Sequence, residues 1–500
     1  MERLTRLVMH HRVVVSVFWI VMLFVGGFSA SQLGDRLTID FSLPGQPGDK
    51  AEEKLVKEFG VSSFDTYIAV VTVPAGETVE GSKDKVAATF KAAHDAVPNT
   101  RMVDLASAGD PAFVSDDGRT TYALLQAPMP TSFGAGIEKE LEPALEKAAA
   151  DAGYKSGLTS YNLLAAGGDT EGPSVLVETL FGALGALLVL MFVFASLLAF
   201  LPMVVAAVSI LTTFSLVLLL STFSDVAFVV QFLIALIGLG VAIDYSLLVV
   251  SRWREERAHG HDNEEAVVIA MKTAGHAVMA SGVTVAISLV ALIVVPVPFL
   301  RSMGIGGMLI PVVSVAVVLT LLPALLSSFG PKIDWPRIRH EGVASRGWSR
   351  WSRMIVRHRI IATLTALAVL ALLILPVLSL KIGQASVDSL AKSGHPYEAL
   401  STLRDGKIGT GVLTPVEVLV NADDADAVAE ATSRVEGVQT AVVGGTNGGQ
   451  AVVDVIPTKE TVDSSANAVV DGIRDAAEDA ADGPVGVTGA GATVQDYFSA

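Results

Sequence analysis

The residue of this chain whose setting points to chemistry is Asp244, a carboxylate within a long apolar run. The stretch from Gly238 to Glu256 reads GLGVAIDYSLLVVSRWREE and turns basic only at Arg252. Arg252 follows Asp244 by eight residues, or about 12 Å along a helix. If Arg252 marks a membrane surface, the carboxyl lies close to the bilayer midplane. A charged aspartate costs roughly 2.5–3.5 kcal/mol there, which argues against a lipid-facing position.

Two interpretations of Asp244 are open. In the first it is a proton-binding group, because removal from water favours the neutral form of a carboxyl. The hydroxyl of Tyr245, the next residue, would then tune or relay the proton. In the second, Asp244 only hydrogen-bonds a serine or threonine on a neighbouring span and so holds helices together. The proton site is the favoured interpretation, given the depth of the residue.

Neighbours for this aspartate can also be proposed. Gly238 and Gly240 lie on or near the same helix face and predict the close approach of another helix. In the following apolar run, Ser281, Thr284 and Ser288 recur at helical spacing. These three residues are possible neighbours of Asp244, although serine and threonine side chains often bond their own helix backbone instead.

Seven apolar runs are long enough to cross roughly 30 Å of hydrocarbon as helices. The first could instead be a signal peptide that ends near residues 29–31, but the same pattern recurs in mid-chain, where no signal peptide can lie. The predicted spans are residues 13–30, 180–198, 203–220, 228–250, 277–295, 303–326 and 360–378.

The short loops carry the basic residues and predict the orientation. The N-terminus, the SRWREER segment and residues 327–359 are rich in arginine and lysine, which favour the cytoplasmic side. Seven crossings from a cytoplasmic N-terminus place all three there. The acidic residues that give the net charge of −16 gather in two hydrophilic blocks, which are expected outside.

Several classes of function have no support in the composition. The chain has no cysteine, so disulfides and thiolate metal sites are excluded. No basic face interleaved with aromatic residues suggests nucleic-acid binding, and no G-x-x-x-x-G-K-[ST] loop suggests ATP as the energy source. His259 and His261 are interpreted as part of a solvated loop rather than as metal ligands. The chain is therefore expected to be a non-enzyme without cofactor or metal.

The two hydrophilic blocks repeat one plan. Strand and helix patterns follow in the order βαββαβ in both, with Asp117 and Gly118 as a hairpin turn in the first. This order predicts ferredoxin-like α/β porter domains. The expected fold is a polytopic α-helical membrane protein with a pseudo-repeat whose second half is incomplete. The predicted segments are 1–30 (N-terminus and first span), 31–174 (first exported domain), 175–326 (spans two to six), 327–359 (basic loop), 360–380 (seventh span) and 381–500 (second exported domain).

These features together resemble the MMPL family of the RND transporter superfamily. The resemblance rests on the order of spans and exported domains, on GLGVAIDYSLLVVSRWREE and on AMKTAGHAVMASGVTVAISL after it. It implies an exporter in the cytoplasmic membrane, driven by the proton gradient, for lipids or other hydrophobic molecules. It also implies that Asp244 and Tyr245, with Ser281 as a weaker match, form the proton relay, and by analogy that a trimer forms.

One departure from the family affects these expectations. Family members place a second Asp-Tyr pair on a tenth helix, and the sequence stops where an eighth span is expected. We therefore expect a fragment or a chain that needs a partner. Alternatives to lipid export are efflux of drugs or small amphiphiles, and a non-transporting scaffold or lipid receptor that recruits envelope-building proteins.

Two further features have alternative interpretations. Residues 264–275 predict a short amphipathic helix, either on the inner membrane surface or packed under the helix bundle. Aromatic residues of the first block either line a hydrophobic path or, more simply, fill the core. They are Phe64, Tyr67, Phe113, Tyr122 and Phe133.

Overall fold

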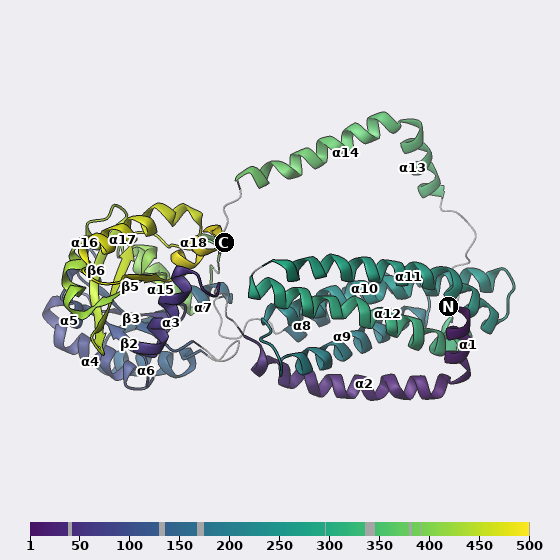
Figure 1. The fold of residues 1–500 in the computed structure, drawn as a ribbon, viewed down its shortest axis with the longest axis horizontal. Coiled ribbons are helices and arrows are strands. Elements are labelled where there is room, and N and C mark those ends of the chain that lie inside the picture. Colours follow the sequence, from purple (N-terminus) through teal and green to yellow (C-terminus); the bar gives the residue numbers. More distant parts are fainter. Residues whose placement is uncertain are drawn as a thin grey trace. The chain divides into compact units, whose positions relative to one another are not determined.

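The computed structural model describes residues 1–38, 43–129, 136–167, 175–295, 297–335, 346–379, 383–390 and 392–499. The chain forms two compact units, each assembled from two stretches of sequence. The helical unit comprises Met1–Asp40 and Pro173–Leu380, and the α/β unit comprises Phe41–Gly172 and Lys381–Ala500. Figure 1 labels their elements.

The helical unit contains long, apolar helices. Within the part of the chain that the structure describes, six are long and apolar enough to cross a membrane, and a shorter apolar helix covers Thr179–Phe194. Each of the seven predicted spans coincides with one of these helices. The helices of this unit are α1 (Glu2–His10), α2 (Arg12–Leu33), α8 (Val175–Phe194), α9 (Phe200–Leu220), α10 (Val229–Ala258), α11 (Asn263–Val294), α12 (Pro298–Ile333), α13 (Arg346–Arg357) and α14 (Arg359–Ile374).

Two predicted boundaries were wrong. The second span ends at Phe194 rather than at residue 198, because Ala195 has a φ of 51° and stops the helix. Residues Leu197–Ala199 instead form a 3-10 turn that leads into α9. The predicted short helix over 264–275 is not separate either: it is the first part of α11, whose 32 residues continue into the span. Ala266, Val267 and Ala270 are fully buried, which matches a helix packed on the bundle.

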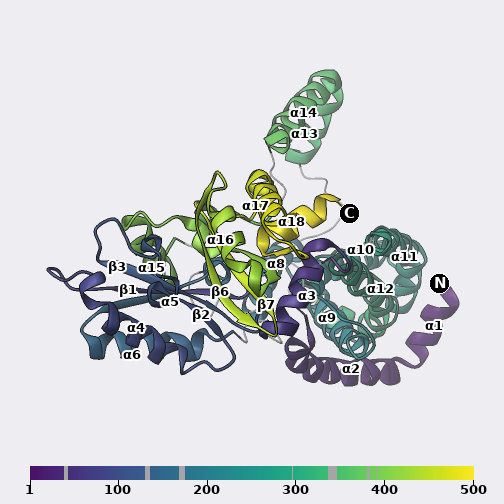
Figure 2. The ribbon, with the colours of Figure 1, turned by 60° about the vertical axis from the view of Figure 1, so that its left-hand side comes forward.

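The bundle is held together by close helix contacts, and Figure 2 shows it nearly along its helices. Helices α10 and α12 contribute most of the fully buried residues. Helix α2 packs on α9 at Gly26, where a Cβ atom would lie 2.3 Å from the carbonyl oxygen of Leu211. Farther along α2, the Trp19 indole donates a hydrogen bond of 2.9 Å to the Thr320 hydroxyl of α12.

The α/β unit contains two four-stranded sheets. Their strand orders are β2-β3-β1-β4 and β6-β7-β5-β8, and all neighbouring strands are antiparallel. The strands are β1 (Thr66–Thr72), β2 (Arg101–Val103), β3 (Thr120–Gln126), β4 (Lys155–Thr159), β5 (Val416–Asn421), β6 (Val438–Asn447), β7 (Gln450–Pro457) and β8 (Gly486–Thr488). The helices are α3 (Pro47–Phe59), α4 (Lys83–His94), α5 (Leu105–Ala108), α6 (Glu138–Ala152), α7 (Tyr161–Ala165), α15 (His395–Asp405), α16 (Ala425–Ser433), α17 (Asn467–Ala480) and α18 (Ala490–Ser499).

The sequence pattern explains these sheets. Strands β1, β3 and β5 are buried along almost their whole length, as near-continuous apolar runs predict. Gly118 has a φ of 69° and forms the predicted turn before β3. The second predicted strand of the first block is shorter than expected, because Asp104 caps the helix α5 through the backbone N–H of Ser107.

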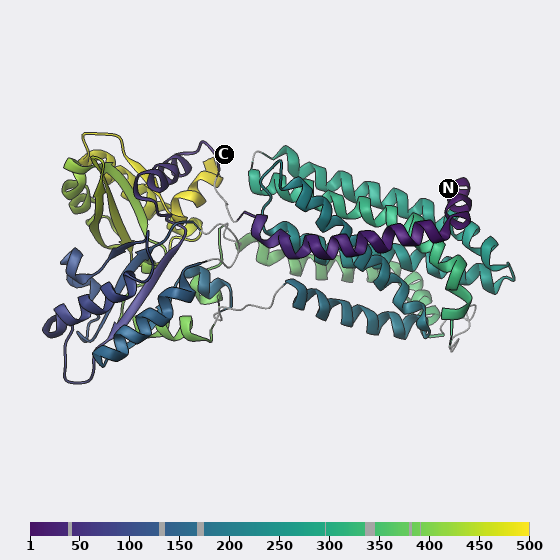
Figure 3. The same ribbon diagram turned by 90° about the horizontal axis from the view of Figure 1, so that it is seen from below.

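Two helices that the sequence analysis did not predict, α3 and α15, each pack on the sheet of the other block. Helix α3 follows the first span, yet its Ala51 and Leu55 pack with Leu419 and Val452 of the second sheet. Helix α15 follows the seventh span, yet Ala399 and its neighbours belong to the core of the first sheet. Figure 3 shows α3, in purple, beside the yellow and green strands. Each sheet is therefore completed by a helix from the other block.

Candidate functional site

Asp244 lies midway along α10. Leu236, Gly240 and Leu248, at four-residue spacing from it, share its exposed face. Among the described residues, the Asp244 carboxylate has no hydrogen bond or ion pair. The other faces of the helix bury residues such as Ile234 against the bundle. A lone carboxylate at this depth is stable when it is neutral or when a further polar group covers it.

Tyr245 points the other way, into the bundle. Its side chain is 5 % exposed, and its hydroxyl has no hydrogen-bond partner among the described residues. Its ring lies against α11, since a Cβ atom on Gly282 would be 3.6 Å from Tyr245 Cε2. A buried hydroxyl without a partner costs about 1–3 kcal/mol, so a polar group that reached Tyr245 and accepted or donated a hydrogen bond would be stabilising.

The two glycines near Asp244 have different surroundings. A Cβ atom on Gly238 would lie 2.7 Å from Ile310 Cδ1 and 2.9 Å from Ile210 Cγ1. Gly238 thus permits α10 to meet α9 and α12 closely. Gly240 differs from the expectation: a Cβ atom there would meet nothing within 4 Å among the described residues. Gly240 thus lies on the exposed face of α10, as Asp244 does.

The polar residues of α11 lie on an exposed face. Ser281, Thr284 and Ser288 are all exposed. Thr284 donates to the carbonyl of Ala280 and Ser288 to that of Thr284, both at 2.9 Å. These two hydroxyls therefore hydrogen-bond the backbone of their own helix, which is the common behaviour of serine and threonine in helices. No hydrogen bond joins Ser281 to Asp244 or Tyr245 in the described part of the chain.

The basic end of α10 has a structural role that the sequence analysis missed. Arg254 is 2 % exposed, donates to the carbonyl oxygen of Phe194 at 3.0 Å and pairs with Asp334 at 3.2 Å. It therefore joins the ends of α8, α10 and α12. Trp253 adds a hydrogen bond of 3.1 Å to Asn263 at the start of α11. The motif fixes one end of the helix that carries Asp244.

The histidines after α10 take part in ordinary contacts. His261 lies 3.4 Å from Glu256 and 3.2 Å from Glu265. His259 is the cap residue that directly follows α10. Both contacts of His261 are with carboxylates on the adjoining helices, so the segment forms a connection between α10 and α11.

A second group of polar residues, also missed, is buried in the α/β unit. Arg101 of β2 makes two bonds of 2.6 Å to Asp454 of β7 and also donates to Gln126. Gln126 donates in turn to Glu417 of β5, which is fully buried. Burial raises the pKa of Glu417 well above its usual range, and the charges of Asp454 and Glu52 raise it further. The two blocks are thus joined by hydrogen bonds that run from Asp454 through Arg101 and Gln126 to Glu417.

Glu52 of the exchanged helix α3 completes this group. Its carboxylate accepts bonds from Ser62 and Ser63 of the first block and, at 2.8 Å, from Thr488 of β8. Hydrogen bonds of this number satisfy a buried carboxylate. Glu52 therefore ties α3 to both sheets.

Two acidic residues, Asp65 and Glu138, lie beside Tyr67 in the first block. The Tyr67 hydroxyl donates to Glu138 at 3.1 Å. Burial raises the pKa of Asp65 to about 6, and the nearby Glu138 charge adds to the rise, while hydrogen bonds from Tyr67 and Asn162 oppose it. Tyr67 itself is buried in the core, as are Phe113 and Tyr122, whereas Phe64 is half-buried. Phe133 lies outside the described residues.

The fold and the placement of Asp244 define a multi-pass membrane protein with soluble α/β domains. The sequence profile of the MMPL family matches residues 40–361, and the chain belongs to that family. This confirms the resemblance found in the sequence.

Three relatives show the range of similarity. The mycolic acid-containing lipids exporter MmpL11 of Mycolicibacterium smegmatis is 34% identical over 263 residues, covering 51% of this chain and 27% of the relative. The membrane protein YdfJ of Bacillus subtilis is 28% identical over 487 residues, covering 93% and 65%. The heme uptake protein MmpL11 of Mycobacterium tuberculosis H37Rv is 34% identical over 245 residues, covering 47% and 25%. The chain thus spans less than two thirds of the length of each.

Proposed function

We propose that this protein is a secondary exporter that moves lipids or other hydrophobic molecules out of the cytoplasmic membrane, driven by the proton gradient. The observation that carries the proposal is the lone carboxylate of Asp244 at the middle of a membrane-spanning helix, on a face that its own bundle leaves open. Membership of the MMPL family supports transport as the general function.

In this proposal Asp244 binds and releases the driving proton. Neutral Asp244 tolerates lipid or an apolar helix, whereas the charged form needs water or a polar partner, so each protonation changes which packing of α10 is stable. One proton that crosses a membrane potential of 100 mV supplies about 2.3 kcal/mol. Tyr245 relays or tunes the proton, with Ser281 of α11 as a weaker contributor.

The proposed topology follows the charges of the loops. The N-terminus and the basic loop 327–359 lie in the cytoplasm, and the domains 31–174 and 381–500 lie outside. The remaining segments are 1–30, 175–326 and 360–380. We further propose that the two exported domains are ferredoxin-like repeats of one another. Their equal strand orders support this pseudo-symmetry.

A hydrophobic substrate is favoured over a polar one. Relatives are named as an exporter of mycolic acid-containing lipids and as a heme uptake protein, and both cargoes are largely apolar. Efflux of a drug or small amphiphile by the same protein is the second candidate, since it needs the same open carboxylate and the same proton coupling.

The test compares Asp244→Asn with Asp225→Asn in the intact protein as the cell makes it. Asp225 is exposed between α9 and α10, so its variant removes the same charge outside the span. Both proteins are placed in inverted membrane vesicles, where acridine-dye quenching follows proton movement and an NBD-labelled phospholipid follows transport. We expect D244N to insert normally but to lose proton-coupled transport, and D225N to keep it.

Two results would count against this proposal. Undiminished transport by D244N would exclude Asp244 as the proton site. A scaffold would be favoured by a different pair of results. The wild-type protein would move neither protons nor lipid in vesicles, and in cells that lack the protein D244N and D225N would restore the cell envelope equally well.

A further inference from the structure

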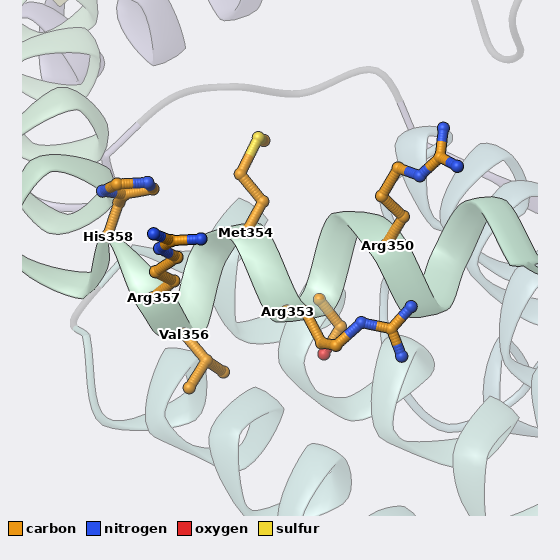
Figure 4. A pocket seen from close by; sticks show the side chains of 7 residues that line it. Arg350, Arg353, Met354, Val356, Arg357 and His358 are labelled. Carbon is orange, nitrogen blue, oxygen red and sulfur yellow. The ribbon is translucent and has the colours of Figure 1, made fainter.

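Helix α13 carries a row of arginines on one face. Arg350, Arg353 and Arg357 follow each other at intervals of three and four residues, which places them along a single helix face. Figure 4 shows their guanidinium groups extending away from the helix, with the ring of His358 at its end. With His358 they line a shallow depression along the helix. We call these three residues the arginine row.

In the part of the chain that the structure describes, no acidic residue neutralises the arginine row. Among the described residues, none of its three members has an ion pair or hydrogen bond to a carboxylate. The sequence from residue 342 to residue 387 contains no aspartate or glutamate at all. An exposed cluster of positive charge of this density attracts anions from outside the chain.

The opposite face of α13 is apolar. Trp351 and Ile355 are four residues apart and lie away from the arginine row, and both are substantially exposed. A helix with cations on one face and a tryptophan with aliphatic residues on the other is suited to the boundary between lipid headgroups and acyl chains.

The position of α13 in the chain puts this helix at a membrane surface. One residue, His358, separates it from α14, whose span Arg359–Leu378 is apolar enough to cross a bilayer. The backbone at His358 departs from helical geometry, with φ of −110° and ψ of 37°, so α13 and α14 run in different directions (Figure 1). A helix that bends away at the end of a span can lie along the surface.

We propose that the arginine row binds the phosphate headgroups of anionic phospholipids in the leaflet where α14 begins. Arginine guanidinium groups form paired hydrogen bonds with phosphate oxygens, and Trp351 and Ile355 enter the acyl region beneath. The lipid acts here as a bound partner that fixes the start of α14. This interaction is independent of what the protein transports.

The absence of cysteine makes the test direct. Ser352→Cys introduces a single thiol on α13, which is labelled with bimane in the full-length chain and reconstituted in phosphatidylcholine nanodiscs. Equal small fractions of nitroxide-labelled phosphatidylglycerol or nitroxide-labelled phosphatidylcholine are then added. The difference in quenching reports the local enrichment of the anionic lipid around α13.

We expect a clear preference for phosphatidylglycerol, with each arginine contributing about fivefold in a low-salt buffer. The triple change of Arg350, Arg353 and Arg357 to Gln abolishes the preference, and the triple change to Lys keeps part of it, because charge remains but the paired geometry is lost. Salt at about 1 M weakens the wild-type preference, since the Debye length falls to about 3 Å. Arg359→Gln, one residue beyond His358 and off the row, is the matched control and keeps the preference.

Three results would overturn the proposal. Equal quenching by both labelled lipids would show that no anionic lipid gathers at α13. An equal loss in the R359Q control would show that total charge, rather than the arginine row, is responsible. Loss of the preference on adding inorganic phosphate at constant ionic strength would show that the row binds a soluble anion.

Discussion

Asp65 offers a quantitative test of the α/β unit. The residue is 3 % exposed, and one of its carboxylate oxygens has no hydrogen-bond partner among the described residues. Burial and the Glu138 charge raise its pKa from 3.8 to about 6. The folded protein therefore holds a proton that the unfolded chain releases, and the free energy of unfolding falls as the pH rises from about 4 to about 6.

The size of the effect follows from the two pKa values. Each pH unit between them is worth about 1.36 kcal/mol, so wild-type protein loses about 3 kcal/mol over this interval. The change Asp65→Asn retains the shape of the neutral carboxyl and cannot ionise. At pH 8 the variant should be more stable by about 2–3 kcal/mol, and at pH 4 the two proteins should be equal.

The assay is hydrogen–deuterium exchange of the full-length chain, read at the β1 peptide and corrected for intrinsic exchange rates. A gain of 2–3 kcal/mol raises amide protection on the order of 100-fold at pH 8. Asp151→Asn, at an exposed position of α6, is the matched control and should leave protection unchanged. Equal protection of D65N and wild type at pH 8, or a gain of the same size at pH 4, would refute the reasoning.

Two further predictions concern packing and burial. Glu417→Gln should raise the free energy of unfolding at pH 8 but not at pH 4. The folded protein holds the pKa of this carboxyl well above the value near 4.5 of the unfolded chain, so ionisation costs stability at high pH. Hydrogen–deuterium exchange at β5 measures the effect, and no gain in protection at pH 8 would contradict it. Gly26→Ala should lower the melting temperature in detergent, since the new methyl group would meet the backbone of Leu211, at a cost of about 1–3 kcal/mol. Gly27→Ala, where nothing lies within 4 Å among the described residues, is its control and should keep or slightly raise the melting temperature, because alanine favours a helix over glycine.

Local patterns were sufficient to predict much of the fold. The length of the apolar runs located the long apolar helices that the structure describes, and short apolar runs between turn residues located the strands of both sheets. The end of α8 could not be predicted, because Ala195 adopts a left-handed conformation that its residue type does not suggest. Helix α3 has a recognisable helical pattern, but no local signal reveals that its apolar face belongs to the second sheet.

The candidate site was predictable in part. The position of Asp244 within its helix follows from the sequence alone. The exposure of Asp244 does not follow from the sequence, because it depends on how α10 is rotated against its neighbours. Glu417, like Asp244, is a charged residue within an apolar run. Charged residues are common in a hydrophilic block, however, so the sequence does not show that this glutamate is buried. Its partners Arg101 and Gln126 come from the other block, so only the folded chain reveals the group.

The exchange of α3 and α15 has a consequence for the order of folding. The first sheet needs Ala399 and Leu400 to close its core, and these residues leave the ribosome long after strand β4. The first domain must therefore wait, with an open apolar edge, until the seventh span has been synthesised. Neither sheet can complete its core without a helix from the other block.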